Sequence, residues 1–321
     1  MKIILIGPGV KPIPPTGWGA VESLVWDYYI NLTKQEHNVI ILNERNLQNV
    51  INKCNVENPD IIHIMYDDHI RLVPHLSCKH IFYTNHFAYI THPNFKNKCA
   101  GYYNNFFKKA ITYKDKIYIF AISEQIRQLF IQEGFPKEKI FLVHNGAREE
   151  EFTYKEVCEK PNKSIYLAKI EQRKKQYLYQ NNESIDFAGN YSNSPFNTKV
   201  KNYLGEWTKP VLYKNLTNYA NLVLLSDGEA DPLVTKEALI AGLGVVVSEC
   251  ASANLDRTLP FVDVIPDNKL NDLDYVKNVI HENRIQSVKN RRQIREYALN
   301  KFSWENVIKL YLKTINENIN F

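Results

Sequence analysis

Two glutamates in the segment 226–249 have a spacing that suits the binding of hydroxyl groups beside a phosphate. The segment reads SDGEADPLVTKEALIAGLGVVVSE, with Glu229 and Glu237 eight positions apart. Pro232 favours the start of a helix, and the free N–H groups of residues 232–235 would attract an anionic phosphate. Because carboxylates would repel that phosphate, we expect Glu229 to face a sugar hydroxyl and Glu237 to face a ribose.

Strand and helix signals alternate along the chain and predict the elements that must position these glutamates. Repeated β–α units of this length favour parallel, doubly wound sheets, that is, an α/β fold. Expected strands are 3–6, 38–42, 60–65, 80–84, 117–122, 139–144, 164–168, 185–188, 222–225, 245–247 and 262–265. Expected helices are 21–34, 123–134, 276–301 and 304–315.

The chain of 321 residues is long enough for two domains. The polar stretch 149–162 has no sustained apolar period, so we place a linker at 151–162. It would separate a domain at 1–150 from a second domain at 163–302, with a closing segment at 303–321. Two such domains usually hold their ligand in a cleft between them, at the carboxyl ends of strands.

Composition excludes several classes of protein. The charge sum, 40 − 35 = +5, permits a phosphorylated substrate or a peripheral contact with an anionic membrane without requiring either. The five cysteines are scattered and include no CxxC pair, which argues against a disulfide framework or structural zinc and favours a reducing compartment. The longest apolar stretch, 238–247, is half of the ~20 residues that a membrane helix needs. We therefore expect a soluble, cytoplasmic protein.

The segment around Glu229 and Glu237 resembles the Glu-x7-Glu signature of glycosyltransferase family 4, whose members are retaining enzymes of GT-B fold. That family usually reads E-G-F-G-L-x-x-x-E-A-x-A-x-G-x-P-V-V, and here Gly242 and the valines at 245–246 match it. The resemblance implies two Rossmann-like domains facing a cleft. The further donor contacts that it implies are Asp231, Pro232, Leu233 and Val234. An ordinary strand, loop and helix with surface carboxylates is the alternative interpretation.

The run SIYLAKIEQRKKQ at 164–176 resembles the family's G-R-x-x-x-x-K. Lys169 stands where Arg is usual and Lys174 where Lys is usual, while Ala168 replaces the usual Gly. Two cations near a pyrophosphate would stabilise the departing nucleoside diphosphate without a metal. Lys175 is a rival for the role of Lys174, and a solvated face is the alternative for the whole run.

The loop PIPPTGWGAVES at 12–23 resembles the family's P-P-x-G-x-G-G-x-E. Gly17 and Gly19 would let the backbone approach the donor closely, although Ala20 replaces the usual second Gly of the pair. Glu22 would contact an acceptor or sugar hydroxyl. Its alternative role is a favourable first-turn position against the helix dipole.

The strand and loop HIFYTNHF at 80–87 resemble the family's T-x-H, which implies that His86 contacts the transferred sugar. A structural histidine is the alternative. Asp67 follows the preceding strand together with Asp68 and His69, and we expect a cap or an acceptor contact there rather than a metal site.

Weaker matches extend over nearly the whole chain. Trp207, in YLGEW, would border the base or belong to the core, and 302–315 resembles a closing helix that packs on the first domain. Residues 88–115 match no family element; their mixed aromatic and basic composition is compatible with an acceptor surface.

The resemblance implies a retaining glycosyltransferase that needs neither metal nor cofactor. It would move a sugar from a nucleoside-diphosphate donor to a hydroxyl on a glycan, lipid or small molecule. The departing phosphate oxygen would take the acceptor proton, and no nucleic-acid partner is expected. A non-catalytic glycan- or nucleotide-binding protein of the same fold is the alternative, suggested by Ala20, Ala168 and Lys169. A nicotinamide-dependent oxidoreductase is disfavoured because GPGVKP is not GxGxxG at the start of a helix.

Overall fold

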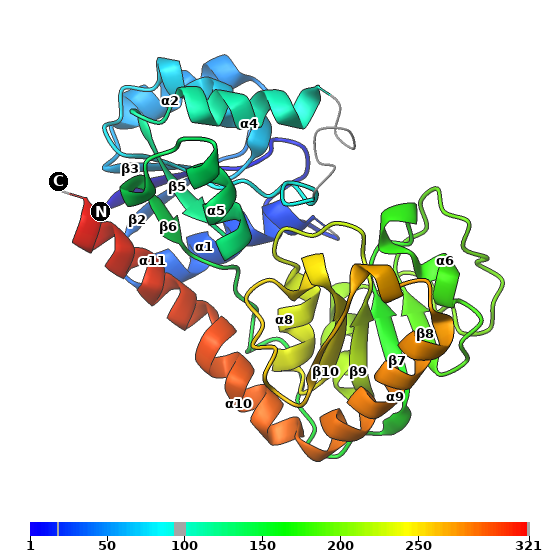
Figure 1. Cartoon of the computed structure of the whole chain (residues 1–321). Coiled ribbons are helices and arrows are strands. Elements are labelled where there is room, and N and C mark those ends of the chain that lie inside the picture. The colour runs from blue at the N-terminus through cyan, green and yellow to red at the C-terminus, as the bar shows by residue number, and fades with distance from the viewer. Residues whose placement is uncertain (18, 93–100, 320–321) are drawn as a thin grey trace. The chain divides into compact units, whose positions relative to one another are not determined.

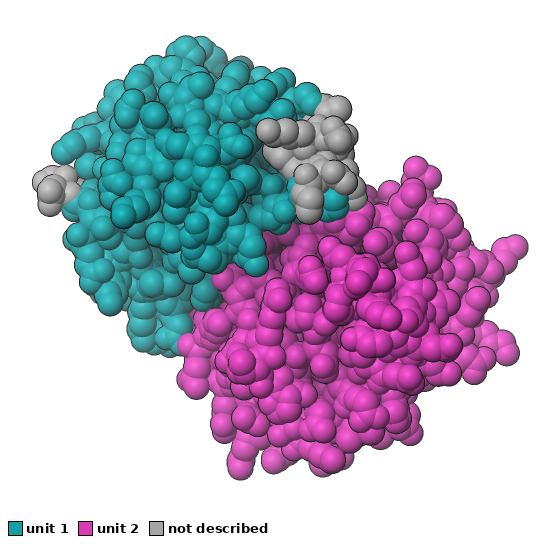
Figure 2. Space-filling view, in the orientation of Figure 1, with its two compact units in different colours: residues 1–145, 304–321 teal, residues 146–303 magenta. Residues whose placement is uncertain are grey.

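The computed structural model describes residues 1–17, 19–92 and 101–319, and the chain divides into two compact units. Unit 1 contains Met1–Asn145 and Trp304–Phe321, and unit 2 contains Gly146–Ser303 (Figures 1 and 2). Each unit has a parallel sheet covered by helices, so the predicted fold class is confirmed. No helix in the described part of the chain is long and apolar enough to cross a membrane.

Unit 1 is built on a six-stranded parallel sheet in the order β2-β1-β3-β4-β5-β6. The strands are β1 (Lys2–Ile6), β2 (Asn38–Leu42), β3 (Ile61–Ile64), β4 (Ile81–Tyr83), β5 (Ile117–Ala121) and β6 (Ile140–Leu142). The central strands are apolar along most of their length because helices cover both faces of a parallel sheet. Ile4 on β1, for example, pairs with Ile40 on one side and Ile62 on the other.

The helices of unit 1 include one from the far end of the sequence. They are α1 (Ala20–Lys34), α2 (Leu47–Glu57), the 3-10 helix η1 (Asp67–His75), α4 (Tyr102–Thr112), α5 (Glu124–Gln132) and α11 (Trp304–Asn318). The α11 helix packs on α1, with the rings of Trp304 and Tyr311 5.1 and 5.2 Å from the ring of Tyr28. All three side chains are buried, so α11 completes the core of unit 1.

Unit 2 is built on a five-stranded parallel sheet in the order β11-β10-β9-β7-β8. The strands are β7 (Lys160–Leu167), β8 (Ile185–Ala188), β9 (Tyr219–Leu224), β10 (Gly244–Ser248) and β11 (Val262–Ile265). The α-helices are α6 (Gln176–Tyr179), α7 (Lys209–Asn215), α8 (Leu233–Ile240), α9 (Leu273–Lys289) and α10 (Arg291–Phe302).

Two expectations about the chain's organisation differ from the structure. Residues 151–162 belong to unit 2 rather than to a linker, because the backbone N–H of Lys155 bonds Oγ1 of Thr217 (2.9 Å) and β7 already begins at Lys160. The expected helix 276–301 is two helices that meet at Asn290, whose φ of −113° and ψ of 18° leave the helical region. This break lets the buried guanidinium of Arg291 bond the carbonyls of residues 155, 217 and 219.

Candidate functional site

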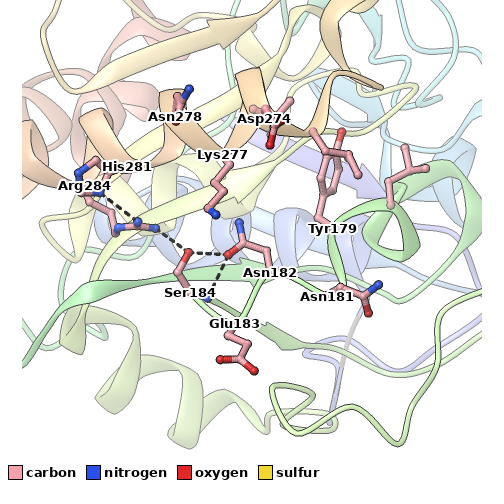
Figure 3. A pocket seen from close by; sticks show the side chains of 13 residues that line it. Tyr179, Asn181, Asn182, Glu183, Ser184, Asp274, Lys277, Asn278, His281 and Arg284 are labelled. Atoms are coloured by element: carbon pink, nitrogen blue, oxygen red, sulfur yellow. Dashed lines mark hydrogen bonds between the residues drawn. The ribbon is translucent and has the colours of Figure 1, made fainter.

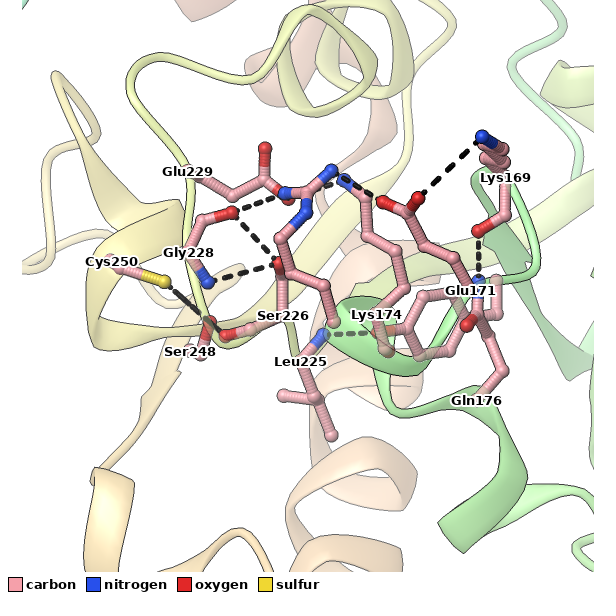
Figure 4. A network of polar contacts seen from close by, with 12 residues as sticks. Lys169, Glu171, Lys174, Gln176, Leu225, Ser226, Gly228, Glu229, Ser248 and Cys250 are labelled. Carbon is pink, nitrogen blue, oxygen red and sulfur yellow. Dashed lines mark hydrogen bonds and ion pairs between the residues drawn. The ribbon is translucent and has the colours of Figure 1, made fainter. Parts of the chain in front are cut away.

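In unit 2, the strands β7 and β9 are parallel neighbours, so the loops that follow them leave the same edge of the sheet. A buried tyrosine ties the two loops together: Tyr166 Oη donates to the carbonyl of Lys174 and accepts from the backbone N–H of Leu225 (2.8 Å). The backbone N–H of Asp227 also bonds the carbonyl of Arg173, at 2.8 Å. These contacts bring Lys174 beside Glu229, although the two residues lie 55 positions apart (Figure 4).

The carboxylate of Glu229 is held by two cations. Its Oε1 is ion-paired with Lys174 Nζ and accepts from Nη1 of Arg173 at 3.2 Å. Burial alone would raise the pKa of Glu229, but the charges of Lys174 and Arg173 outweigh that effect and lower it. Glu229 is therefore an ionised carboxylate, 7 % exposed, that is held between two cations.

Arg173 is the member of this cluster that the sequence did not single out. Its Nη2 also bonds Glu171 (2.6 Å), and the Nζ of Lys169 lies 3.8 Å from the same carboxylate. Lys175 has a left-handed backbone (φ 55°) and pairs with Asp227 at 3.4 Å. Of the rivals Lys174 and Lys175, the structure thus brings Lys174 to Glu229 (Figure 4). The Nζ of Lys169 contacts Glu171 rather than Glu229.

Asp231, one of the expected donor contacts, has its carboxylate turned into the interior of unit 2. Its carboxylate is fully buried, forms an ion pair with the equally buried Lys236 and accepts from Nδ2 of Asn254 at 2.9 Å. Charges removed from water need such a partner. The ion pair therefore fixes the loop to α8.

The first turn of α8 carries the remaining predicted donor residues. Pro232 is the residue that caps the helix, and Leu233 and Val234 are half-buried in the turn that follows. Glu237 is half-buried on the same helix. Trp207 is buried, with its ring 6.2 Å from that of Tyr219, which favours its core interpretation over stacking on a base.

In unit 1, a second polar cluster lies at the carboxyl ends of β3 and β4. Tyr83 Oη donates to Oδ1 of the buried Asp67 (2.8 Å), and Nδ2 of Asn85 donates to Tyr83 Oη (3.2 Å). Burial raises the pKa of Asp67 to about 6, although the hydrogen bond from Tyr83 acts in the opposite direction. Burial lowers the pKa of His86 to about 4, and its buried Nε2 has no hydrogen-bond partner among the described residues.

The glycine loop of unit 1 places Glu22 in the first turn of α1, where its side chain is 7 % exposed. Gly19 is the N-cap of this helix, and a Cβ atom there would lie 2.8 Å from Oε2 of Glu22. A Cβ atom at Gly17 would have no atom of the described residues within 4 Å. A side chain at position 19 would therefore displace the carboxylate of Glu22, whereas position 17 has room for one.

No group of three or more His, Cys, Asp or Glu that could hold a metal ion is found in residues 1–17, 19–92 and 101–319. Beside Asp67, Asp68 pairs with Arg71 at 2.7 Å, and His69 is buried. Asp272, which begins an Asp-Leu-Asp sequence, caps α9 by accepting from the backbone N–H of Tyr275.

Comparisons of the sequence found no matching family model and no matching curated protein. Among solved structures, the chain is similar to HepE from Anabaena in complex with UDP and glucose, with 13 % identity, a TM-score of 0.73 and coverage of 99 % of this chain and 100 % of that one. It is also similar to sucrose-phosphate synthase from Thermosynechococcus elongatus, with 13 % identity, a TM-score of 0.74 and 98 % coverage of both chains. The lipopolysaccharide outer core galactosyltransferase WaaB gives 15 % identity, a TM-score of 0.66 and coverage of 99 % and 100 %. The fold is therefore that of the GT-B glycosyltransferases.

Proposed function

We propose that this chain is a retaining, metal-independent glycosyltransferase that uses a nucleoside-diphosphate sugar as donor. The observation that carries the proposal is the cluster of Lys174, Arg173 and Glu229 at the carboxyl ends of β7 and β9. Counted with Glu171 and Lys169, the network holds three cations and two carboxylates, and this excess positive charge suits a pyrophosphate. The carboxylate of Glu229 suits a sugar hydroxyl. The UDP and glucose bound to HepE, which has the same fold, support this choice of donor class.

The proposed mechanism is electrostatic. When the glycosidic bond to the donor breaks, negative charge grows on the departing phosphate, and Lys174 and Arg173 would stabilise it in place of a divalent metal. The departing phosphate oxygen takes the proton of the acceptor hydroxyl on the same face of the sugar. Glu229 would orient the transferred sugar, and Glu237 would bind the ribose. The protein then contributes position and charge rather than a covalent nucleophile.

Unit 1 is assigned the acceptor side in this proposal. In its polar cluster, the carboxyl of Asp67 suits a hydroxyl of the acceptor or the sugar, and the imidazole of His86 would contact the transferred sugar. Glu22, in the first turn of α1, is a further candidate for a hydroxyl contact.

The decisive experiment separates the two glutamates of unit 2. Glu237→Gln should raise KM for the donor with little change in kcat, because a ribose contact is equally strong in ground and transition states. Glu229→Gln should lower kcat and kcat/KM together, because its contact matters most in the transition state. Folded variants with the same kinetics would contradict these roles.

The donor is identified first by thermal shift with a panel of nucleotide sugars, since a bound ligand raises the apparent stability. Hydrolysis of that donor is then measured with and without EDTA. Activity that survives EDTA supports the cation mechanism, and activity lost with EDTA and restored by manganese contradicts it. Donor binding with no hydrolysis or transfer would identify a non-catalytic nucleotide-binding protein.

A further inference from the structure

A cavity of about 680 Å³ lies in unit 2 between α9 and the segment that joins α6 to β8 (Figure 3). Ser184, in its lining, directly precedes β8, whereas Glu229 follows the end of the parallel strand β9. The cavity therefore lies at the amino-terminal edge of the sheet, opposite the Glu229 cluster. Its volume is typical of sites that bind small molecules.

Arg284 is buried in the wall of this cavity and has no carboxylate partner among the described residues. Its side chain is 7 % exposed, and its Nη1 donates to the hydroxyls of Ser164 (3.0 Å) and Ser184 (3.1 Å). Its Nη2 lies 3.4 Å from Nδ1 of His281. These contacts leave Nε–H and one N–H of Nη2 without an acceptor among the described residues, and none of them supplies a negative charge.

A second buried arginine of unit 2, Arg291, provides a comparison, because its guanidinium bonds only groups of the protein's own interior. Arg291 uses Nε, Nη1 and Nη2 to donate to the carbonyls of Lys155, Tyr219 and Thr217 at 2.6–3.0 Å. Arg284 has no comparable set of carbonyl acceptors among the described residues. Desolvation of its guanidinium lowers its pKa. A buried cation with donors still unused points to an anion that the cavity would admit.

Two more side chains of α9 add hydrogen-bond donors beside Arg284. Lys277, His281 and Arg284 are spaced by four and three residues, which places them on one face of the helix. All three line the cavity, and Lys277 and His281 are exposed in it. A planar carboxylate has only two oxygens for these three groups, whereas a phosphate ester offers three strong acceptor oxygens.

The other lining groups suit hydroxyls. Figure 3 shows Arg284 and His281 at one end of the lining and Asn181 and Asp274 toward the other. Amide and carboxylate oxygens accept hydrogen bonds from hydroxyl groups. Glu183 is an exposed acid of the lining that would repel an anion.

We propose that this cavity binds a phosphorylated polyol of hexose size, with the phosphate at Arg284, His281 and Lys277 and the hydroxyls toward Asn181 and Asp274. The site is separate from the proposed donor site, and its test does not depend on transferase activity.

Calorimetry on the full chain at low ionic strength, with glucose 6-phosphate as the probe, tests the proposal. Lys277→Ala should weaken binding about tenfold, whereas Lys289→Ala, which removes an exposed lysine elsewhere on α9, should leave it unchanged. Glu183→Gln should strengthen binding severalfold by removing a repulsive charge. Glucose and gluconate should bind at least tenfold more weakly than glucose 6-phosphate, because neither carries a phosphate.

Three results would overturn the proposal. One is the absence of glucose 6-phosphate binding, and another is an equal effect of Lys277→Ala and Lys289→Ala. The third is loss of glucose 6-phosphate binding in the presence of saturating UDP, which would place the probe in the donor site instead. Equal affinity for inorganic phosphate would contradict the polyol part of the proposal.

Discussion

The carboxyl ends of the two sheets hold a buried carboxylate in different ways. In unit 2, Glu229 is paired with the cations of Lys174 and Arg173, and its pKa is lowered. In unit 1, Asp67 accepts a hydrogen bond from the neutral hydroxyl of Tyr83 and has no ion pair among the described residues, and burial raises its pKa to about 6. The comparison shows that a neutral donor does not offset desolvation, whereas two cations do.

This difference fits a division of labour in the proposed reaction. An excess of positive charge suits the pyrophosphate of a donor, while the hydrogen-bonding groups of the unit 1 cluster suit the hydroxyl groups of a sugar or an acceptor. The predictions below test that contrast between a carboxylate held by cations and one held by a neutral hydroxyl.

The largest effect is expected at the fully buried ion pair of unit 2. Lys236→Met leaves the carboxylate of Asp231 without its cation, and removing one partner of a buried pair costs about 3–5 kcal/mol. Urea unfolding measures the loss. The double variant Asp231→Asn/Lys236→Met should recover much of it, because no charge is left buried.

The control for this prediction is an exposed pair. Lys309→Met breaks the surface pair with Glu305 on α11, and such exposed pairs contribute little to stability because water screens them. If Lys236→Met were no more destabilising than Lys309→Met, buried charge pairing would not hold the loop of unit 2.

The next effect is a dependence of stability on pH in unit 1. Unfolded Asp67 loses its proton near pH 3.8 and folded Asp67 near pH 6, so the folded state binds more protons between these values. The free energy of unfolding contributed by this group therefore falls as pH rises from about 4 to about 6 and is constant above that. The fall is about 3 kcal/mol. Asp67→Asn should abolish it in urea unfolding measured across this range.

Asp272 provides the control of opposite sign. Hydrogen bonds from the backbone N–H of Tyr275 and from Lys269 lower its pKa. Its contribution to stability is therefore present above its unfolded pKa and lost as pH falls through the folded value. A difference profile of Asp67→Asn with the same sign as that of Asp272→Asn would refute the contrast between the units.

Much of the fold was predictable because its strands are short, nearly continuous apolar runs, such as KIILI in β1 and NVIIL in β2. Parallel strands buried on both faces give that pattern. The α2 helix was not predicted because only Val50 and Cys54 are buried in it, so the helix has too few buried apolar residues to give a helical pattern in the sequence.

The site was predictable in part. The RKK run at 173–175 does not indicate which cation turns inward, since that depends on the 3-10 turn Gln172–Lys174 and the left-handed Lys175. The structural role of Asp231 did have a signal in the sequence: Lys236 is a lysine within the largely apolar helix LVTKEALI, where a buried cation needs a carboxylate.

The third prediction concerns donor affinity. Lys174→Ala should weaken UDP binding by an order of magnitude or more, because hydrogen bonds to charged groups contribute about 1.5–3 kcal/mol. Lys175→Ala is the matched control, since its partner is Asp227 and not Glu229. Calorimetry with UDP measures both. Equal losses would mean that the whole run acts only through its net charge.

The smallest effect is expected at Lys169. It decides whether the second cation that binds the donor is Lys169, as the sequence resemblance implies, or Arg173, which contacts Glu229 in the structure. The resemblance places Lys169 where an arginine usually binds the donor, but its side chain is 48 % exposed and 3.8 Å from Glu171, while Arg173 contacts Glu229. Exposed pairs contribute about 0–1 kcal/mol, so Lys169→Ala should weaken UDP binding about fivefold at most. Arg173→Ala, measured in the same titration, should weaken it more. If the order were reversed, Lys169 would be the donor's second cation, and binding would have to draw it away from Glu171 while Arg173 stays with the carboxylate. The charged cluster of unit 2 would then be an arrangement that the donor rearranges, rather than one already formed to receive it.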